Sequence, residues 1–258
     1  MSPLAFGLLF IGGLFLGMLV LIEVGRRYGN KRLTQLEGTP HKGVGPIEGV
    51  VYGLLSLLIG FSFFGAAGRF DARRQAIAPE ANIIATAYAR LDLLPAAAQP
   101  AFRELFRQYL DSRLETYRLL PDIAAAQSEL AHSRQLQFEI WSRAVALARD
   151  TGAPPAMGLL LPSVNQMGEI LTTRVEGMKY HPPMPIFFML GMFALMAAFL
   201  SGYGMAGDKS RSLLHIVGFA VAVSITLFII MNMEYPRLGF IRLDSADTVL
   251  YELRASMK

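Results

Sequence analysis

The side chains that could carry out acid–base or metal chemistry are few and scattered along this sequence. Its four histidines, His41, His132, His181 and His215, lie far apart, and no two have the spacing of a metal-binding pair. Each is interpreted as an interfacial or helix-surface residue. The sequence has no cysteine, which excludes disulfides, thiol catalysis and thiolate metal sites. It also contains no P-loop, nucleophile elbow, zinc-protease motif or dinucleotide fingerprint, so we expect neither an enzyme nor a cofactor or metal site.

The acidic residues offer no clearer site. Glu80 and Asp92 are interpreted as solvated or capping carboxylates. Glu234, Asp244 and Asp247 are too widely spaced for a calcium-binding loop, which places oxygen ligands at about every second position. Nucleic-acid binding requires a basic face with interleaved aromatic residues, and no stretch has that pattern. The net charge of +4 is therefore assigned mostly to Lys and Arg beside apolar segments.

The most informative stretch lies between residues 53 and 70, where small and large apolar residues alternate. Residues four apart share one helix face, so Gly53, Leu57, Phe61 and Gly65 form one stripe. Small residues of this kind allow helices to pack closely in lipid. Alternatively, Leu and Phe contributed by several subunits would form a hydrophobic constriction that gates a pore by dewetting. The residues alone favour the first interpretation and leave the second open.

Four apolar stretches are long enough to place such helices in a membrane. A spanning helix needs about 20 apolar residues, and the stretches cover residues 4–24, 46–67, 184–206 and 213–233. Only 17% of the residues are charged, against about 25% in soluble proteins, and the deficit is concentrated in these stretches. The first stretch has no basic region before it and no cleavage site after it, so it is interpreted as a retained helix rather than a signal peptide.

The segment 69–181 has the pattern of a helical domain outside the membrane. An amphipathic helix is expected from about Pro100 to Pro121, and further helices over about 124–149 and 157–179. No stretch alternates as a strand would, so the class is an all-α membrane protein. We expect transmembrane helices 1 and 2 in residues 1–68, the helical domain in 69–181, transmembrane helices 3 and 4 in 182–235, and a C-terminal segment in 236–258. The apolar residues of the helix expected from Pro100 to Pro121 are Phe102, Leu105, Phe106, Tyr109, Leu110, Leu114 and Tyr117.

Sidedness does not follow from charge. Lys and Arg near the span ends are equally numerous on the two sides, so the positive-inside rule gives no orientation. An even number of spans does place both termini and the helical domain on the same side.

Two short motifs, one within residues 60–74 and one within 234–239, carry a resemblance to a known family. Gly60-Phe61 followed by an Ala-rich turn and Gly68-Arg69-Phe70 resembles the second-helix signature of bacterial bestrophins. The segment 234–239 is similar to the Glu-x-Pro-x-Gly segment of that family. The likeness is greatest to a bacterial bestrophin-like membrane protein family of unknown function, with its Arg-Phe-Asp-x-Arg-Arg, Glu-Ala-Asn, Leu-Asp-Leu-Leu-Pro and Glu-Tyr-Pro-Arg-x-Gly stretches. The residues that carry these motifs here are Arg69, Phe70, Asp71, Arg73, Glu80, Asn82, Glu234, Pro236 and Gly239.

The resemblance implies a pentameric ion channel with a hydrophobic neck on the second helix and a cytoplasmic helical domain. Matched through Gly60-Phe61, the neck positions fall on Gly53, Leu57 and Phe61, where Gly53 replaces a bulky apolar residue and shortens the constriction. The expected partners are copies of the chain, the lipid bilayer of the bacterial inner membrane and a permeant ion, but no nucleic acid. The alternative is a non-conducting membrane scaffold or envelope sensor that acts through its helical domain.

Overall fold

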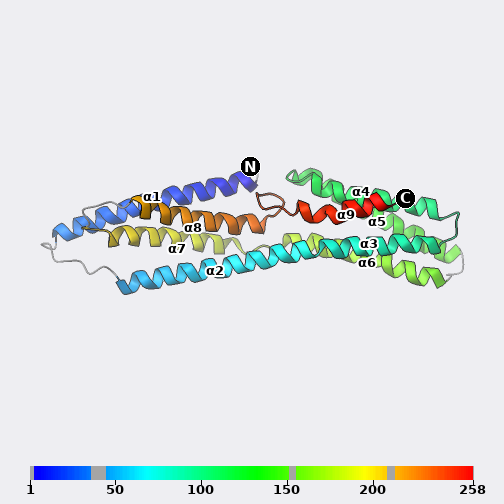
Figure 1. Cartoon of the computed structure of the whole chain (residues 1–258), viewed down its shortest axis with the longest axis horizontal. Helices are drawn as coiled ribbons and strands as arrows, with labels where there is room; N and C mark the ends of the chain where they lie inside the picture. The colour runs from blue at the N-terminus through cyan, green and yellow to red at the C-terminus, as the bar shows by residue number, and fades with distance from the viewer. Residues whose placement is uncertain (1–2, 36–44, 151–154, 208–212, 258) are drawn as a thin grey trace. The chain divides into compact units, whose positions relative to one another are not determined.

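Every regular element in the described part of the chain is a helix. The computed structural model describes residues 3–35, 45–150, 155–207 and 213–257 (Figure 1). The predicted all-α class is therefore confirmed for these residues. His41 lies outside them, as do the other residues of 36–44 and residues 208–212. The helices are α1 (Pro3–Gln35), α2 (Gly45–Gln75), α3 (Ile77–Ala89), α4 (Gln99–Arg118), α5 (Ile123–Asp150), α6 (Pro155–Lys179), α7 (Met184–Gly204), α8 (Leu213–Glu234) and α9 (Thr248–Ser256), with short 3-10 helices η1 (Arg90–Leu93) and η2 (Asp244–Asp247).

The chain forms two compact units, which are described separately. The membrane unit consists of Met1–Arg69 and His181–Tyr235, and the helical unit consists of Phe70–Tyr180 and Pro236–Lys258. Each unit is therefore built from two stretches of chain. Four helical stretches are long and apolar enough to cross a membrane, and they include α1, α2, α7 and α8, as the sequence predicted.

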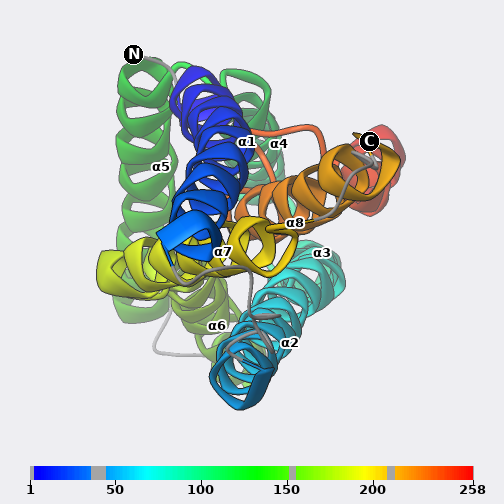
Figure 2. The ribbon, with the colours of Figure 1, turned by 90° about the vertical axis from the view of Figure 1, so that its left-hand side faces the viewer.

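The membrane unit is centred on α1, which packs against α7 and α8 (Figure 2). Its hydrophobic core is formed by buried apolar residues from all four of its helices. α2 contributes only three residues to this core, Val51, Leu55 and Ala66. The other members of this core are Leu14, Met18, Ile22, Leu190, Ala194, Ala197, Ala198, Ala220, Leu227 and Ile230.

Glycines bring the backbones of α1 and α7 into direct contact. A Cβ atom on Gly202 would lie 1.9 Å from the carbonyl oxygen of Ile22, and one on Gly25 would lie 2.1 Å from that of Phe199. Real side chains do not approach backbone so closely, so only glycine fits at these two positions. Close packing through small residues, which the sequence associated with α2, is thus found between α1 and α7.

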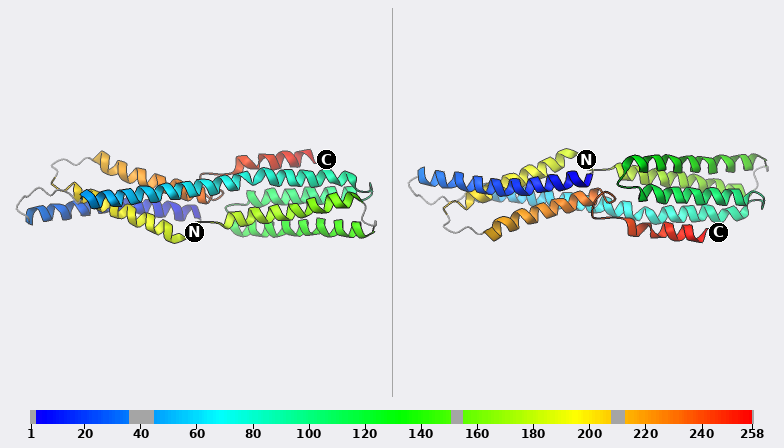
Figure 3. Two further views of the ribbon diagram at one scale, coloured as in Figure 1. Left: turned by 90° about the horizontal axis from the view of Figure 1, so that it is seen from below. Right: turned by 90° about the horizontal axis from the view of Figure 1, so that it is seen from above.

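The helical unit is a bundle of α3, α4, α5 and α6, with α9 packed on α3 and α4 (Figure 3). All seven apolar residues predicted for the 100–121 helix are buried on α4, because their spacing of three and four places them on one face. The helix expected over about 124–149 is found as α5. Its buried face passes through Ser133, Leu136, Ile140 and Ala144, whereas the large Phe138 is 67% exposed.

The break between α2 and α3 follows from Pro79. Proline has no amide hydrogen, so it cannot donate to the carbonyl of Gln75, four residues earlier. α2 accordingly ends at Gln75. Pro79 occupies the first turn of α3, where a backbone donor is not needed. The break at Ala76 thus follows from the sequence.

Candidate functional site

The predicted stripe on α2 lies on a face that is not packed within the described structure. Leu57 and Phe61 are 52% and 69% exposed. Gly53 is also exposed, and a Cβ atom on it would meet no other atom within 4 Å. Gly65 differs, because it is partly covered by the guanidinium of Arg69, 3.3 Å from its would-be Cβ. Three of the four stripe residues therefore form a continuous open surface.

The opposite face of α2 belongs to the core of the membrane unit. Val51, Leu55 and Ala66 are buried there, and the hydroxyl of Tyr52 lies 3.5 Å from the carbonyl oxygen of Ala197 on α7. Exposure is not restricted to the stripe, since Leu54 and Phe64 are also exposed. An apolar surface of this extent is stable against lipid or against another protein surface, but not in water.

Arg69 and Glu234, from two separate motifs, meet at the end of the membrane unit. Glu234 is fully buried, and both of its oxygens accept hydrogen bonds from Nε of Arg69, at 2.9 and 3.1 Å, while Nη2 donates a further one. His181 Nδ1 lies 3.7 Å from the same carboxylate, and its ring stacks on Tyr235 at 4.4 Å between centroids. The pair joins the helix α2 to the last residue of α8.

Arg73 has a different role from Arg69, although the two share one motif. It is buried in the helical unit, where it donates to the carbonyl oxygens of Gly177, at 3.2 Å, and Tyr180, at 2.6 Å. These carbonyls lie at the C-terminal end of α6, where a cation is favourable. Of the remaining motif residues, Asp71 and Asn82 are exposed, Phe70 and Gly239 are partly buried, and Pro236 is buried.

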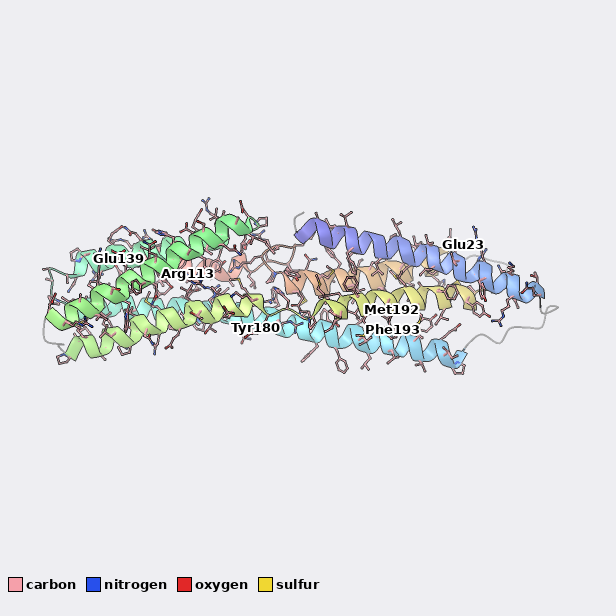
Figure 4. The ribbon with its side chains drawn as sticks, turned by 180° about the vertical axis from the view of Figure 1, so that it is seen from behind. Glu23, Arg113, Glu139, Tyr180, Met192 and Phe193 are labelled. Atoms are coloured by element: carbon pink, nitrogen blue, oxygen red, sulfur yellow. The ribbon has the colours of Figure 1, made fainter. Side chains whose placement is uncertain are left out.

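The helical unit contains a buried charge cluster, defined here as Glu80, Arg113, Arg174, Arg237 and Asp247. Both oxygens of Glu80 accept hydrogen bonds, one from Nε of Arg113 at 2.8 Å and the other from Nη1 of Arg174. Arg237 and Asp247 form a bidentate pair at 2.6 and 2.9 Å. Figure 4 marks Arg113 on α4 within this unit. The interpretation of Glu80 as a solvated or capping carboxylate is wrong, because it is fully buried and joins α3 to α4 and α6.

Tyr117 lies at the centre of this cluster. The guanidinium carbons of Arg237, Arg174 and Arg113 lie 4.1, 4.7 and 5.0 Å from the centroid of its ring. Its hydroxyl accepts a hydrogen bond from Nη2 of Arg113. Burial raises the pKa of the Tyr117 hydroxyl, which the charge of Arg113 partly offsets. Burial, followed by repulsion from Arg237, lowers the pKa of the Arg174 guanidinium to about 9.

One sequence signal could have revealed this cluster. Arg113 stands between Tyr109 and Tyr117 at steps of four, so it falls on the apolar face of the 100–121 helix. A charged residue on such a face must be paired when it is buried. Its partners could not be found in this way, because Glu80, Arg174 and Asp247 lie on other elements.

The described residues offer no group of three or more His, Asp or Glu side chains arranged to hold a metal ion. Asp92 is exposed and pairs with Arg103, and His132 is exposed on α5, as expected for solvated side chains. The two candidate functional features within the described residues are the α2 stripe and the buried charge cluster.

Comparison with known proteins places the sequence in a family and the fold among solved structures. The Bestrophin-like domain family matches residues 12–247. Two crystal structures of variants of a bacterial Bestrophin homolog from Klebsiella pneumoniae have the same fold, with TM-scores of 0.67 and 0.66 at 12% and 15% sequence identity. In each case the alignment covers 96% of this chain and 98% of the other. No curated protein matches. The chain is a membrane protein that belongs to the Bestrophin-like family.

Proposed function

We propose that this protein is an oligomeric, most simply pentameric, ion channel of the bacterial inner membrane. The observation that carries the proposal is the open stripe on α2, formed by Gly53, Leu57 and Phe61. Copies of α2 around a common axis would place these residues in rings that face the ion path. Family membership supports the channel class, since the chain matches the Bestrophin-like domain over most of its length.

The stripe has the chemistry of a gate rather than of a binding site. Rings of Leu and Phe disfavour water in a narrow passage, so ions cannot pass until the passage wets. Gly53 adds no side chain, so the constriction would consist of two apolar rings, at Leu57 and Phe61. An apolar ring does not distinguish the sign of an ion. Selectivity would therefore come from other parts of the ion path.

The test is a flux measurement on protein reconstituted in liposomes. Leu57→Ala and Phe61→Ala widen the proposed rings, so each should raise ion flux above that of the unmodified protein. Leu55→Ala is the matched control, because Leu55 is buried in the membrane unit two residues away. Its loss should lower stability by about 2–5 kcal/mol without raising flux. Leu54 is a poorer control, since it is itself 42% exposed.

The same preparations give the oligomeric state. Native mass measurement in mild detergent should give five copies, and a stable monomer would contradict the channel. The pore is also excluded if Leu57→Ala and Phe61→Ala destabilise the protein while flux stays at the level of empty liposomes. That second result would favour a non-conducting scaffold or envelope sensor, which acts through the helical unit and needs no ion path.

A further inference from the structure

The buried charge cluster contains more positive than negative charge. Glu80 pairs with both Arg113 and Arg174, whereas Asp247 pairs with Arg237. All five side chains are buried. Three guanidinium groups therefore face two carboxylates inside the helical unit.

The nearest further carboxylate does not correct this imbalance. Asp244 lies 3.9 Å from Arg237, but it is half exposed and already pairs with Arg242 at 2.5 Å. Including both Asp244 and Arg242 leaves the same excess of one positive charge. A buried charge without a counter-charge is strongly unfavourable, because the protein interior solvates it poorly.

Two polar atoms beside this excess charge have no hydrogen-bond partner within the described structure. They are Nη1 of Arg113 and the hydroxyl of Tyr109, both on fully buried side chains. The two residues are one helical turn apart on the same face of α4, and burial raises the pKa of the Tyr109 hydroxyl, so it keeps its proton at neutral pH. Both atoms can therefore donate a hydrogen bond, and both require an acceptor.

We propose that the helical unit binds a small monovalent anion, such as chloride, between Nη1 of Arg113 and the hydroxyl of Tyr109. One negative charge balances the excess of the cluster, and one anion accepts both donors. Water would satisfy the hydrogen bonds but not the charge. A divalent oxyanion such as sulfate would reverse the imbalance and would require more donors than these two groups supply.

The surroundings favour a compact ion. The same face of α4 also carries Phe106 and Leu110, which are fully buried in the apolar core. An anion there would be enclosed by apolar side chains on one side and by guanidinium groups on the other. It would stabilise the folded helical unit, because only that state holds the two donors together. This site is independent of whether α2 conducts ions.

The proposal is tested by thermal unfolding of the full chain in detergent. Sodium gluconate is replaced by sodium chloride, bromide or sulfate at constant ionic strength. We expect the melting temperature to rise with chloride and bromide toward saturation, and not with sulfate. Equal melting temperatures in chloride and gluconate would overturn the proposal. So would an equal rise with sulfate, which indicates a general salt effect.

Two variants separate this site from other anion effects. Tyr109→Phe removes one donor without altering charge, and should raise the half-saturating chloride concentration about tenfold or more. Tyr251→Phe is the control, because it removes an exposed hydroxyl on α9 and should leave that concentration unchanged. Crystals soaked in bromide should give an anomalous peak beside Arg113 and Tyr109. An unchanged half-saturating concentration in Tyr109→Phe, or bromide peaks only elsewhere, would refute the site.

Discussion

Replacing Gly202 by alanine should force α1 and α7 apart. The added Cβ would lie 1.9 Å from the carbonyl oxygen of Ile22, and 2.6 and 2.8 Å from its carbonyl carbon and Cα. A close contact between carbon and carbonyl oxygen is about 3.3 Å, so the two helices must separate locally by about 1.4 Å. The atoms in the way are backbone, so no side-chain rotation can relieve the contact.

The expected cost follows from this geometry. Inserting one methyl group into a packed core costs about 1–3 kcal/mol, and the upper end applies where backbone must move. A gap of about 0.5–1 Å already loses a quarter to a half of each dispersion contact, and neighbouring pairs such as Gly25 with Phe199 would be separated too. Alanine regains about 1 kcal/mol of helix propensity. We therefore expect Gly202→Ala to lower the free energy of unfolding by about 2 kcal/mol.

Unfolding in mixed micelles with an increasing fraction of SDS, followed by circular dichroism, measures this change. Gly218→Ala on α8 is the matched control, because a Cβ atom there meets nothing within 4 Å. That variant should match or slightly exceed the stability of the unmodified protein. If Gly202→Ala unfolds at the same SDS fraction as Gly218→Ala, the close contact between α1 and α7 is not present in the protein.

Three further predictions concern two ion pairs and the orientation of the chain in the membrane. Glu80→Gln leaves two buried guanidinium groups without a counter-charge, and should lower the free energy of unfolding by about 3–5 kcal/mol in the same assay. The control is Glu139→Gln in a surface pair, which should change it by less than about 1 kcal/mol. A double-mutant cycle on Arg69 and Glu234 should give a coupling energy of about 2 kcal/mol, below the value for a fully buried pair because the Arg69 side chain is 34% exposed. Reporter domains fused after the last residue and within 124–127 should both report the cytoplasm, and periplasmic signals from both would reverse the proposed orientation.

The parts of the fold that depend on local pattern could be predicted from sequence. The four spans follow from length and hydropathy, and α4 follows from apolar residues at steps of three and four. The break before α3 also has a local cause in Pro79. α5 was less predictable because its buried face is made of small residues such as Ala144 and Ser133, while the large Phe138 points away from the core.

The parts that depend on distant contacts could not be predicted in this way. Glu80 looks like a surface carboxylate in sequence, because the arginines that pair with it lie 33 and 94 residues further along the chain. The sequence associated close helix packing with the glycines of α2, whereas the structure places the closest backbone contacts at Gly25 and Gly202, on α1 and α7. Resemblance to a family did identify Arg69 and Glu234 as motif residues, but only the structure pairs them.

The two-part construction of the helical unit has a consequence for its biosynthesis. Arg237 and Asp247 belong to the last stretch of the chain, which is synthesised after the intervening segment 181–235 that carries α7 and α8. At about 5–20 residues per second, this segment delays them by roughly 3–11 s after Tyr180 leaves the ribosome. Through that interval, α3 to α6 must persist without the residues that complete their charged core. The helical unit can therefore be completed only after α7 and α8 have been synthesised.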